Sequence, residues 1–417
     1  MSYTDIMKNI LSISTESKTK SNGQIYQDQL LTYISKNNAD NSTWKRMDTD
    51  TASKWLEDEY LFLETKFDNN KLYHKVITVK GKYVNSDKFN TDSSYAKSVF
   101  DELTDVGQTG IYALEILSIV KYSHPNLASL IEMEEFFIYD TFASNVVYFT
   151  HMTLPYYGKD MSEVDLSSSD ISQCVRIAGD LYDGLDHLHN KVFIAHTDIK
   201  PGNICLSDDH LHATIIDFGS CLLLRQQMVK EKYSTLHGTR VRNTFGYCSP
   251  SQFVAFLFGM EEEGDVCTSD LKKLMGSVYF TARAEIKRCI VERYKNMFTF
   301  MGDVLFETRE TAEENDLFCL SLCVFEMLSG GVHFFTKRRN FSHNKTDLCS
   351  VCNNVVCYFQ DPGSYVRDMC KTYIRSYDKI RETPVVQQMS SCLSALTRFT
   401  EDEDILAIVG DEWDMDE

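Results

Sequence analysis

The feature that most constrains this chain is a polar loop placed between segments that must be buried. Residues 171–189 carry apolar side chains at helical spacing, and the run His-Thr-Asp-Ile-Lys-Pro-Gly-Asn follows at residues 196–203. The apolar residues 213–216 then lead directly into Asp217-Phe218-Gly219. We therefore expect a loop after a long helix and a second loop after a short buried strand, each carrying oxygen-bearing side chains.

The side chains of these two loops suit the transfer of a phosphoryl group. That reaction needs positioning and charge neutralisation more than covalent participation by the protein. A carboxylate such as Asp198 can orient an attacking hydroxyl, and Asn203 and Asp217 offer the hard oxygen ligands that Mg²⁺ prefers. Phe218 can pack into a core while Gly219 lets the chain turn.

Together, the two segments resemble the catalytic loop and the metal-binding segment of protein kinases. The resemblance implies that Asp198 accepts the proton of a substrate hydroxyl and that Lys200 steadies the transferred phosphate. It also implies that Asn203 and Asp217 hold Mg²⁺, that ATP is the phosphate donor, and that proteins are the substrates. Lys200 favours the serine/threonine class, because tyrosine kinases have a different loop at this point.

The resemblance continues upstream of the loop. Glu115 and the turn at residues 124–126 look like the αC helix of a kinase and the turn that follows it. In that family the glutamate pairs with a strand lysine that contacts the α- and β-phosphates. Lys97 has the typical spacing from Glu115, and Lys82 and Lys88 are competing candidates.

Two further segments are candidates for contact with ATP. Residues 79–84 are the candidate phosphate-covering loop, but Gly81 stands where the family has several glycines, so an ordinary strand and turn is the alternative. Residues 154–160 resemble the hinge of casein-kinase-like and vaccinia-related kinases. Backbone groups near Tyr156 and Tyr157 would then contact adenine.

Residues 244–250 look like the end of a kinase activation segment. Thr244 matches the threonine that bonds the catalytic aspartate and lysine, whereas Ser251 replaces a glutamate, so that residue's buried ion pair is absent or rebuilt. Asp316 would cap the catalytic-loop backbone. Thr197 replaces the arginine that receives an activation-loop phosphate, which predicts activity without phosphorylation by that route.

The order of elements predicts an α+β chain with a bilobal, protein-kinase-like fold, because strands with one helix precede a mostly helical part. The predicted parts are a small sheet-rich N-lobe at about 71–155 and a larger helical C-lobe at about 156–405, which form the kinase domain 71–405. We expect an N-terminal extension at 1–70 with an amphipathic helix at 44–67, an insertion at 259–311 and an acidic tail at 406–417.

Composition limits partners and location. The chain of 417 residues has 61 acidic and 42 basic side chains, a net charge of −19, which argues against nucleic acid or anionic lipid as a partner. The sequence has no apolar run long enough for a membrane span and no apparent signal peptide. With 13 cysteines, it suits a reducing cytoplasmic or nuclear compartment, within a host cell if the divergence reflects a viral or intracellular source.

Three functions remain to be weighed. The first is ATP-dependent phosphorylation of protein serine and threonine hydroxyls. The alternative is a pseudokinase, a nucleotide-binding or scaffold module, which the glycine-poor segment at Gly81 would favour. A small-molecule kinase of the aminoglycoside or choline type fits less well, because it does not account for Lys200 or Phe218. Neither the substrate nor the oligomeric state follows from the sequence.

Overall fold

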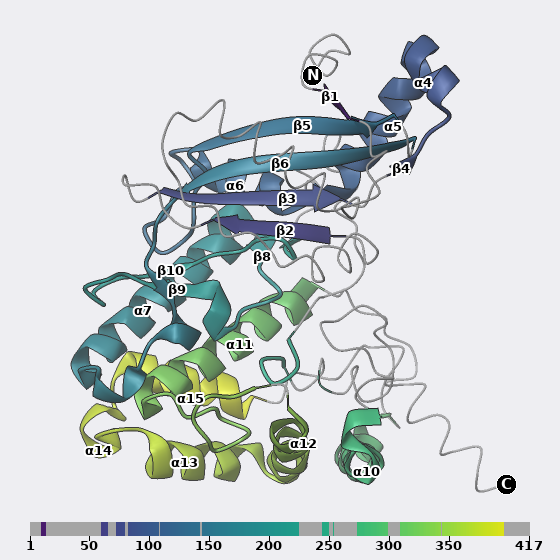
Figure 1. Cartoon of the computed structure of the whole chain (residues 1–417). Coiled ribbons are helices and arrows are strands. Elements are labelled where there is room, and N and C mark those ends of the chain that lie inside the picture. Colours follow the sequence, from purple (N-terminus) through teal and green to yellow (C-terminus); the bar gives the residue numbers. More distant parts are fainter. Residues whose placement is uncertain are drawn as a thin grey trace, which may run out of the picture. The chain divides into compact units, whose positions relative to one another are not determined.

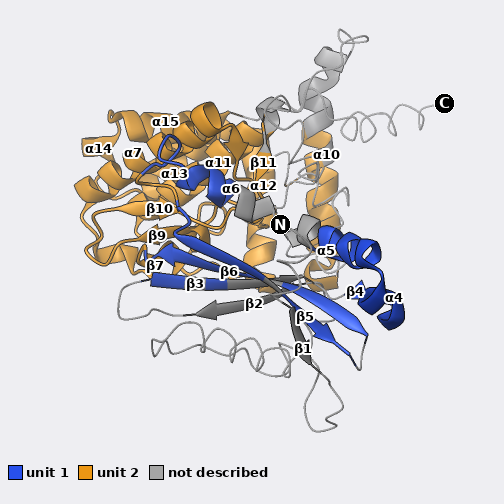
Figure 2. Cartoon of the chain, turned by 90° about the horizontal axis from the view of Figure 1, so that it is seen from above, with its two compact units in different colours: residues 1–124, 128–156 blue, residues 125–127, 157–417 orange. Residues whose placement is uncertain are grey.

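The computed structural model covers the whole chain and is described here for part of it (Figure 1). The described residues are 10–13, 60–65, 72–79, 82–107, 109–141, 144–224, 244–249, 253, 273–298, 309–342 and 344–395. Gly81, Ser251, the acidic tail and much of the N-terminal extension and the insertion lie outside them. The described chain divides into two compact units, shown in blue and orange in Figure 2.

Unit 1, residues 1–124 and 128–156, is built on one mixed sheet with the strand order β1-β5-β6-β3-β2. β1 runs parallel to β5, whereas the other pairs are antiparallel, and β4 pairs with β6. The strands are β1 (Ile10–Ile13), β2 (Tyr60–Thr65), β3 (Leu72–Val79), β4 (Lys82–Tyr83), β5 (Glu132–Asp140) and β6 (Asn145–Pro155). β5 and β6 form a long antiparallel hairpin, with Glu132 opposite Thr153 and Asp140 opposite Asn145.

The expected helix at 44–67 is wrong for residues 60–65, which form β2. The segment begins with the short apolar run 60–63, and such a run has no periodicity that separates a strand from a helix. Its pairing with β3, from Tyr60 opposite Val79 to Thr65 opposite His74, decides the conformation.

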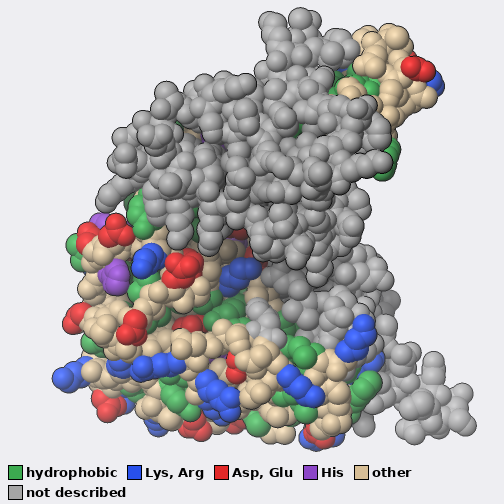
Figure 3. All heavy atoms as spheres, viewed as in Figure 1, with side chains coloured by type: hydrophobic (Ala, Val, Ile, Leu, Met, Phe, Trp, Pro, Cys, Tyr) green, Lys and Arg blue, Asp and Glu red, His purple; other side chains and the backbone are tan. Residues whose placement is uncertain are grey.

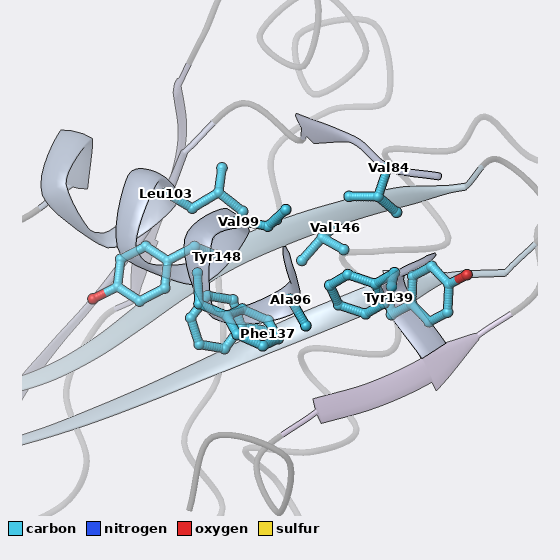
Figure 4. Close-up of a cluster of buried hydrophobic side chains, with 10 residues drawn as sticks. Val84, Ala96, Val99, Leu103, Phe137, Tyr139, Val146 and Tyr148 are labelled. Atoms are coloured by element: carbon cyan, nitrogen blue, oxygen red, sulfur yellow. The ribbon is translucent and has the colours of Figure 1, made fainter. Parts of the chain in front are cut away.

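Three helices lie between β4 and β5: α4 (Ser86–Thr91), α5 (Ser93–Gly107) and α6 (Thr109–Ser118). Helix α5 buries one face, made of Ala96, Val99, Phe100 and Leu103, at the spacing of a helix stripe. That face packs on alternate residues of the sheet, Phe137 and Tyr139 from β5 with Val146 and Tyr148 from β6 (Figure 4). Each large side chain buried in this way contributes about 1.5–3 kcal/mol.

Unit 2, residues 125–127 and 157–417, is mostly helical. Helix α11 packs against both α7 and α15, α10 packs against α12, and α13 contacts α15. The helices are α7 (Ile171–His187), α10 (Ser277–Phe298), α11 (Arg309–Ser329), α12 (Lys345–Gln360), α13 (Pro362–Tyr373), α14 (Tyr377–Ile380) and α15 (Pro384–Ser394). No helix within the described ranges is long and apolar enough to cross a bilayer.

Two small sheets of unit 2 carry the polar loops. One has the order β10-β9-β7, and the other pairs β11 with β8, all antiparallel. The strands are β7 (Lys159–Asp160), β8 (Ile194–Ala195), β9 (Ile204–Leu206), β10 (Ala213–Ile215) and β11 (Leu222–Leu223). Small sheets and helices in this order accord with the predicted α+β class.

Candidate active site

The polar loop begins where the buried helix α7 ends. The chain passes through the turn at Leu188–Val192, reverses at Phe193 with φ 62°, and enters β8. Asp316 of α11, fully buried, accepts the backbone N–H of His196 at 2.6 Å and that of Thr197 at 2.7 Å. His189 also contacts this carboxylate, with Nε2 at 2.9 Å from Oδ2. The predicted cap on the loop by Asp316 is confirmed.

Asp198 lies at the centre of a compact polar cluster. Lys200 Nζ is 2.8 Å from its Oδ2, and the Thr244 hydroxyl donates to its Oδ1 at 2.9 Å. Lys200 Nζ also donates to Thr244 Oγ1 at 2.8 Å, so the three residues close a triangle. Asn203 Nδ2 donates to the Asp198 backbone carbonyl at 2.8 Å and reaches Oδ2 at 3.2 Å. The structure therefore brings together the loop residues and Thr244 as the sequence predicts.

Burial and the neighbouring polar groups shift the pKa of Asp198 in opposite directions. Burial raises the pKa of its carboxyl above the usual value, whereas Lys200 and the Thr244 hydroxyl lower it without offsetting burial. The carboxylate is thus a somewhat stronger base than a solvated aspartate, while the lysine beside it still favours its ionised form. These are properties that suit a group required to accept a proton from a hydroxyl.

Asn203 and Asp217 are joined through the β9–β10 hairpin. The N–H of Ile216, next to Asp217, donates to the Asn203 carbonyl at 2.9 Å. Asp217 has φ 62°, and the ring of Phe218 is buried 5.1 Å from that of His196. Because the Asn203 amide nitrogen donates to Asp198, the Asn203 side-chain oxygen is the atom that can bind a metal ion. One amide oxygen and one carboxylate fit Mg²⁺, which keeps several water or phosphate ligands.

The segment around Thr244 is anchored to α11. The N–H of Ser249 donates to Asn315 Oδ1 at 3.1 Å, and the phenol of Tyr247 donates to Glu326 Oε2 at 2.7 Å. Burial raises the pKa of Glu326 from its ordinary value of 4.5 to about 7, although the bond from Tyr247 lowers it. These contacts hold the segment on the same helix that supplies Asp316. Sequence reasoning missed Asn315 and Glu326, because nothing in the sequence showed that they were buried.

Of the two unit 1 residues predicted to act together near the phosphates, one does not lie on the kind of element that the sequence predicted. Glu115 is half-buried on α6, but Lys97 lies on the exposed face of α5, so its expected position on a strand is wrong. The physical reason is the helical spacing of the apolar residues on either side of Lys97. Strand β3 carries one lysine, Lys75, which is half-buried and lies opposite Met152.

Tyr157 is half-buried at the start of unit 2, and Gly158 follows it with φ 105°. A side chain at Gly158 would lie 1.8 Å from the Leu206 carbonyl oxygen, so the pairing of β7 with β9 requires glycine there. Contact of Tyr157 with adenine stays a prediction, as do the nucleotide roles of Lys97, Glu115 and Gly81.

An aspartate held by a lysine, a threonine and an asparagine, beside donors for Mg²⁺, is the arrangement of a phosphoryl-transfer site. Residues 86–252 match the family model described as "Protein kinase domain". The matched residues include helices α4–α6, the β5–β6 hairpin and both polar loops.

Curated relatives from Arabidopsis thaliana are similar to part of the chain. A leaf rust 10 disease-resistance locus receptor-like protein kinase-like 2.1 is 31% identical over 154 residues, 36% of this chain and 22% of the relative. PR5-like receptor kinase is 30% identical over 154 residues, with the same coverage of 36% and 22%. A G-type lectin S-receptor-like serine/threonine-protein kinase, CES101, is 31% identical over 157 residues, 36% and 17% of the two chains.

The chain spans about a fifth of the length of these curated relatives. The family match and the relatives support the interpretation of this part of the chain as a protein kinase domain.

Proposed function

We propose that the chain transfers the γ-phosphoryl group of ATP to serine or threonine hydroxyls of protein substrates, with Mg²⁺. The observation that carries this proposal is the closed triangle of Asp198, Lys200 and Thr244. A carboxylate held at both oxygens keeps one orientation, and orientation is most of what this reaction asks of the protein.

Each residue of the cluster has a definable task. Asp198 accepts the hydrogen bond, and then the proton, of the substrate hydroxyl, which aligns that oxygen for attack. Lys200 places a positive charge beside the transferred group. Asn203 and Asp217 would hold Mg²⁺, which when bound neutralises charge on the phosphates. Burial raises the pKa of Asp198 and so makes its carboxylate a stronger base than a solvated aspartate.

The serine/threonine class and the substrate type are further parts of the proposal. Lys200 and the printed name of CES101 favour serine/threonine specificity. The net charge of −19 weakly favours basic substrates. On the face drawn in colour in Figure 3, acidic and basic side chains are interspersed. Residues 154–160 support a narrower likeness to casein-kinase-like and vaccinia-related kinases.

A pseudokinase is the second candidate, favoured by the exposed position of Lys97 on a helix. A cytoplasmic or nuclear location is also a proposal. It is supported by the described cysteines, all of which are free thiols.

The test is phosphate transfer from radiolabelled ATP to a mixture of basic proteins, with and without Mg²⁺. Asp198→Asn should lower the rate by about 10²–10⁴-fold, the usual contribution of a positioned base, while leaving the melting temperature nearly unchanged. Asp217→Ala should abolish Mg²⁺-dependent transfer.

The matched control is Asp183→Asn, an exposed aspartate on α7. It should behave as the unmodified chain does. A thermal shift with Mg-ATP measures binding separately. Binding without any transfer would reject the proposal in favour of the pseudokinase.

A further inference from the structure

The β8–β11 ladder continues beyond the residues assigned to its strands. Ala195 lies opposite Leu222 in this antiparallel pair. On the same register Phe193 lies opposite Leu224, and the Leu224 N–H donates to the Phe193 carbonyl at 2.8 Å. Hydrogen-bonded and non-bonded pairs alternate in antiparallel ladders, so every second pair after this one is also a bonding position.

Counted from Phe193–Leu224, the next bonding positions toward the site are Ala195–Leu222 and then Thr197–Ser220. A regular ladder would have the Thr197 N–H donate to the Ser220 carbonyl. Here the backbone turns away with φ 64° at Thr197, and the N–H goes to Asp316 at 2.7 Å. The Thr197 hydroxyl donates to the Ser220 carbonyl at 2.5 Å in its place. The Thr197 hydroxyl thus makes the hydrogen bond to Ser220 that the Thr197 N–H would make in a regular ladder.

This replacement of a backbone hydrogen bond by a side-chain hydrogen bond leaves Thr197 in an unfavourable backbone conformation. Left-handed φ is unfavourable for a β-branched residue, because Cβ crowds the backbone, and it persists only where the surroundings fix it. Thr197 is fully buried, and its N–H and hydroxyl donate to two different elements. A valine of the same shape would fill the space but would leave the Ser220 carbonyl without this donor.

The two ends of this bond lie at the two loops of the active site. Thr197 immediately precedes Asp198, and Ser220 lies in the turn that follows Asp217, closed by the Cys221 N–H donating to the Phe218 carbonyl at 3.2 Å. We propose that Thr197 is a positioning residue that holds the Asp217 loop in register with the catalytic loop through its hydroxyl.

This role rests on the proposed function and extends it to regulation. The link between the two loops is a neutral hydrogen bond within unit 2, so it is complete without an added phosphate. Its formation depends on a hydroxyl at position 197, and serine can supply one whereas valine cannot.

The test compares Thr197→Val with Thr197→Ser. In Thr197→Val, the Mg²⁺ concentration for half-maximal binding of a fluorescent ATP analogue should rise about fivefold to tenfold, as expected for one buried hydrogen bond. The concentration for half-maximal transfer should rise in parallel. Thr197→Ser should stay within about twofold of the unmodified chain, because it keeps the hydroxyl.

A second readout needs neither nucleotide nor activity. Backbone amides in a peptide covering residues 214–224 should exchange hydrogen faster in Thr197→Val than in Thr197→Ser. The matched control is Thr383→Val, which removes a similar bond, from Thr383 Oγ1 to the Ile380 carbonyl at 2.7 Å. This control should leave both the Mg²⁺ dependence and the exchange of that peptide unchanged.

The outcomes separate the two proposals. An unmodified chain that binds Mg-ATP but transfers nothing refutes the kinase activity, and the binding and exchange comparisons still decide the role of Thr197. Equal Mg²⁺ dependence and equal exchange in the valine and serine variants would overturn that role. A chain that binds no Mg-ATP would refute the kinase activity, and the exchange comparison would then decide the role of Thr197.

Discussion

Replacing Glu326 with glutamine should make the stability of the protein less dependent on pH. The folded chain raises the pKa of this carboxyl from 4.5 to about 7, mainly through burial. Between these two pH values the folded state binds more protons than the unfolded state, so stability falls as pH rises. Each pKa unit corresponds to about 1.4 kcal/mol, which makes the full loss about 3 kcal/mol between pH 4.5 and just above 7.

The glutamine variant keeps an acceptor for the Tyr247 phenol, whose pKa is raised well above its usual value by burial and by Glu326. The phenol therefore remains a donor throughout this range. The new amide N–H₂ adds a cost for its own burial, but that cost is the same at every pH.

Urea unfolding measured at several pH values from 4.5 to 8 gives the free energy of unfolding for each chain. The difference, unmodified chain minus Glu326→Gln, should fall by about 3 kcal/mol across this range. Glu163→Gln, at an exposed glutamate, is the control and should show a nearly constant difference. Parallel curves for the unmodified chain and Glu326→Gln would refute the reasoning.

Three further predictions follow from the site. Asp316→Asn should lower the free energy of unfolding by about 2–3 kcal/mol and remove most activity, since a donor then faces backbone N–H groups. The control Asp361→Asn, at the N-cap of α13, keeps an oxygen that accepts the Ser364 N–H and should leave both stability and activity nearly unchanged. In the kinase family the phosphate-contacting lysine lies on a strand, so Lys75→Met on β3 should weaken Mg-ATP binding more than Lys97→Met on α5. The reverse order in a titration would support the assignment to Lys97. Phosphatase treatment should leave transfer activity intact, because the Thr197 hydroxyl links the two loops without a phosphate. Mass spectrometry would show whether the treated chain has lost its phosphates. Activity that is lost on treatment and restored by phosphorylation of one site would contradict the prediction.

The central part of the site could be predicted because it is local in sequence. Asp198, Lys200 and Asn203 belong to one short loop, and a hairpin brings the residue before Asp217 onto Asn203. Asp316 was also predictable, but only through resemblance to a family, because no pattern in the residues themselves indicates a contact between α11 and the loop.

The incorrect prediction that Lys97 lies on a strand has a different origin. Lys97 was placed by its spacing from Glu115, whereas the apolar residues Ala96, Val99 and Phe100 set the conformation around it. These residues have helical spacing, and reading their period first would have predicted α5.

The other features that the sequence did not predict depend on contacts between segments far apart in the chain. The strand formed by residues 10–13 lies parallel to β5, and residues 60–65 join β3, although neither segment signals its partner. The burial of Glu326 is equally invisible in the sequence, because it depends on how α11 packs within unit 2.

Asp316 makes the folding of unit 2 a condition for assembling the site. Its carboxylate accepts the N–H groups of His196 and Thr197 from the interior of α11, so the loop acquires its shape only after that helix has docked. Catalytic competence should therefore be all-or-none along a denaturant titration. A partly folded chain with a native-like α7 and an undocked α11 would lack the carboxylate that holds the His196 and Thr197 N–H groups, and its polar loop would not be formed.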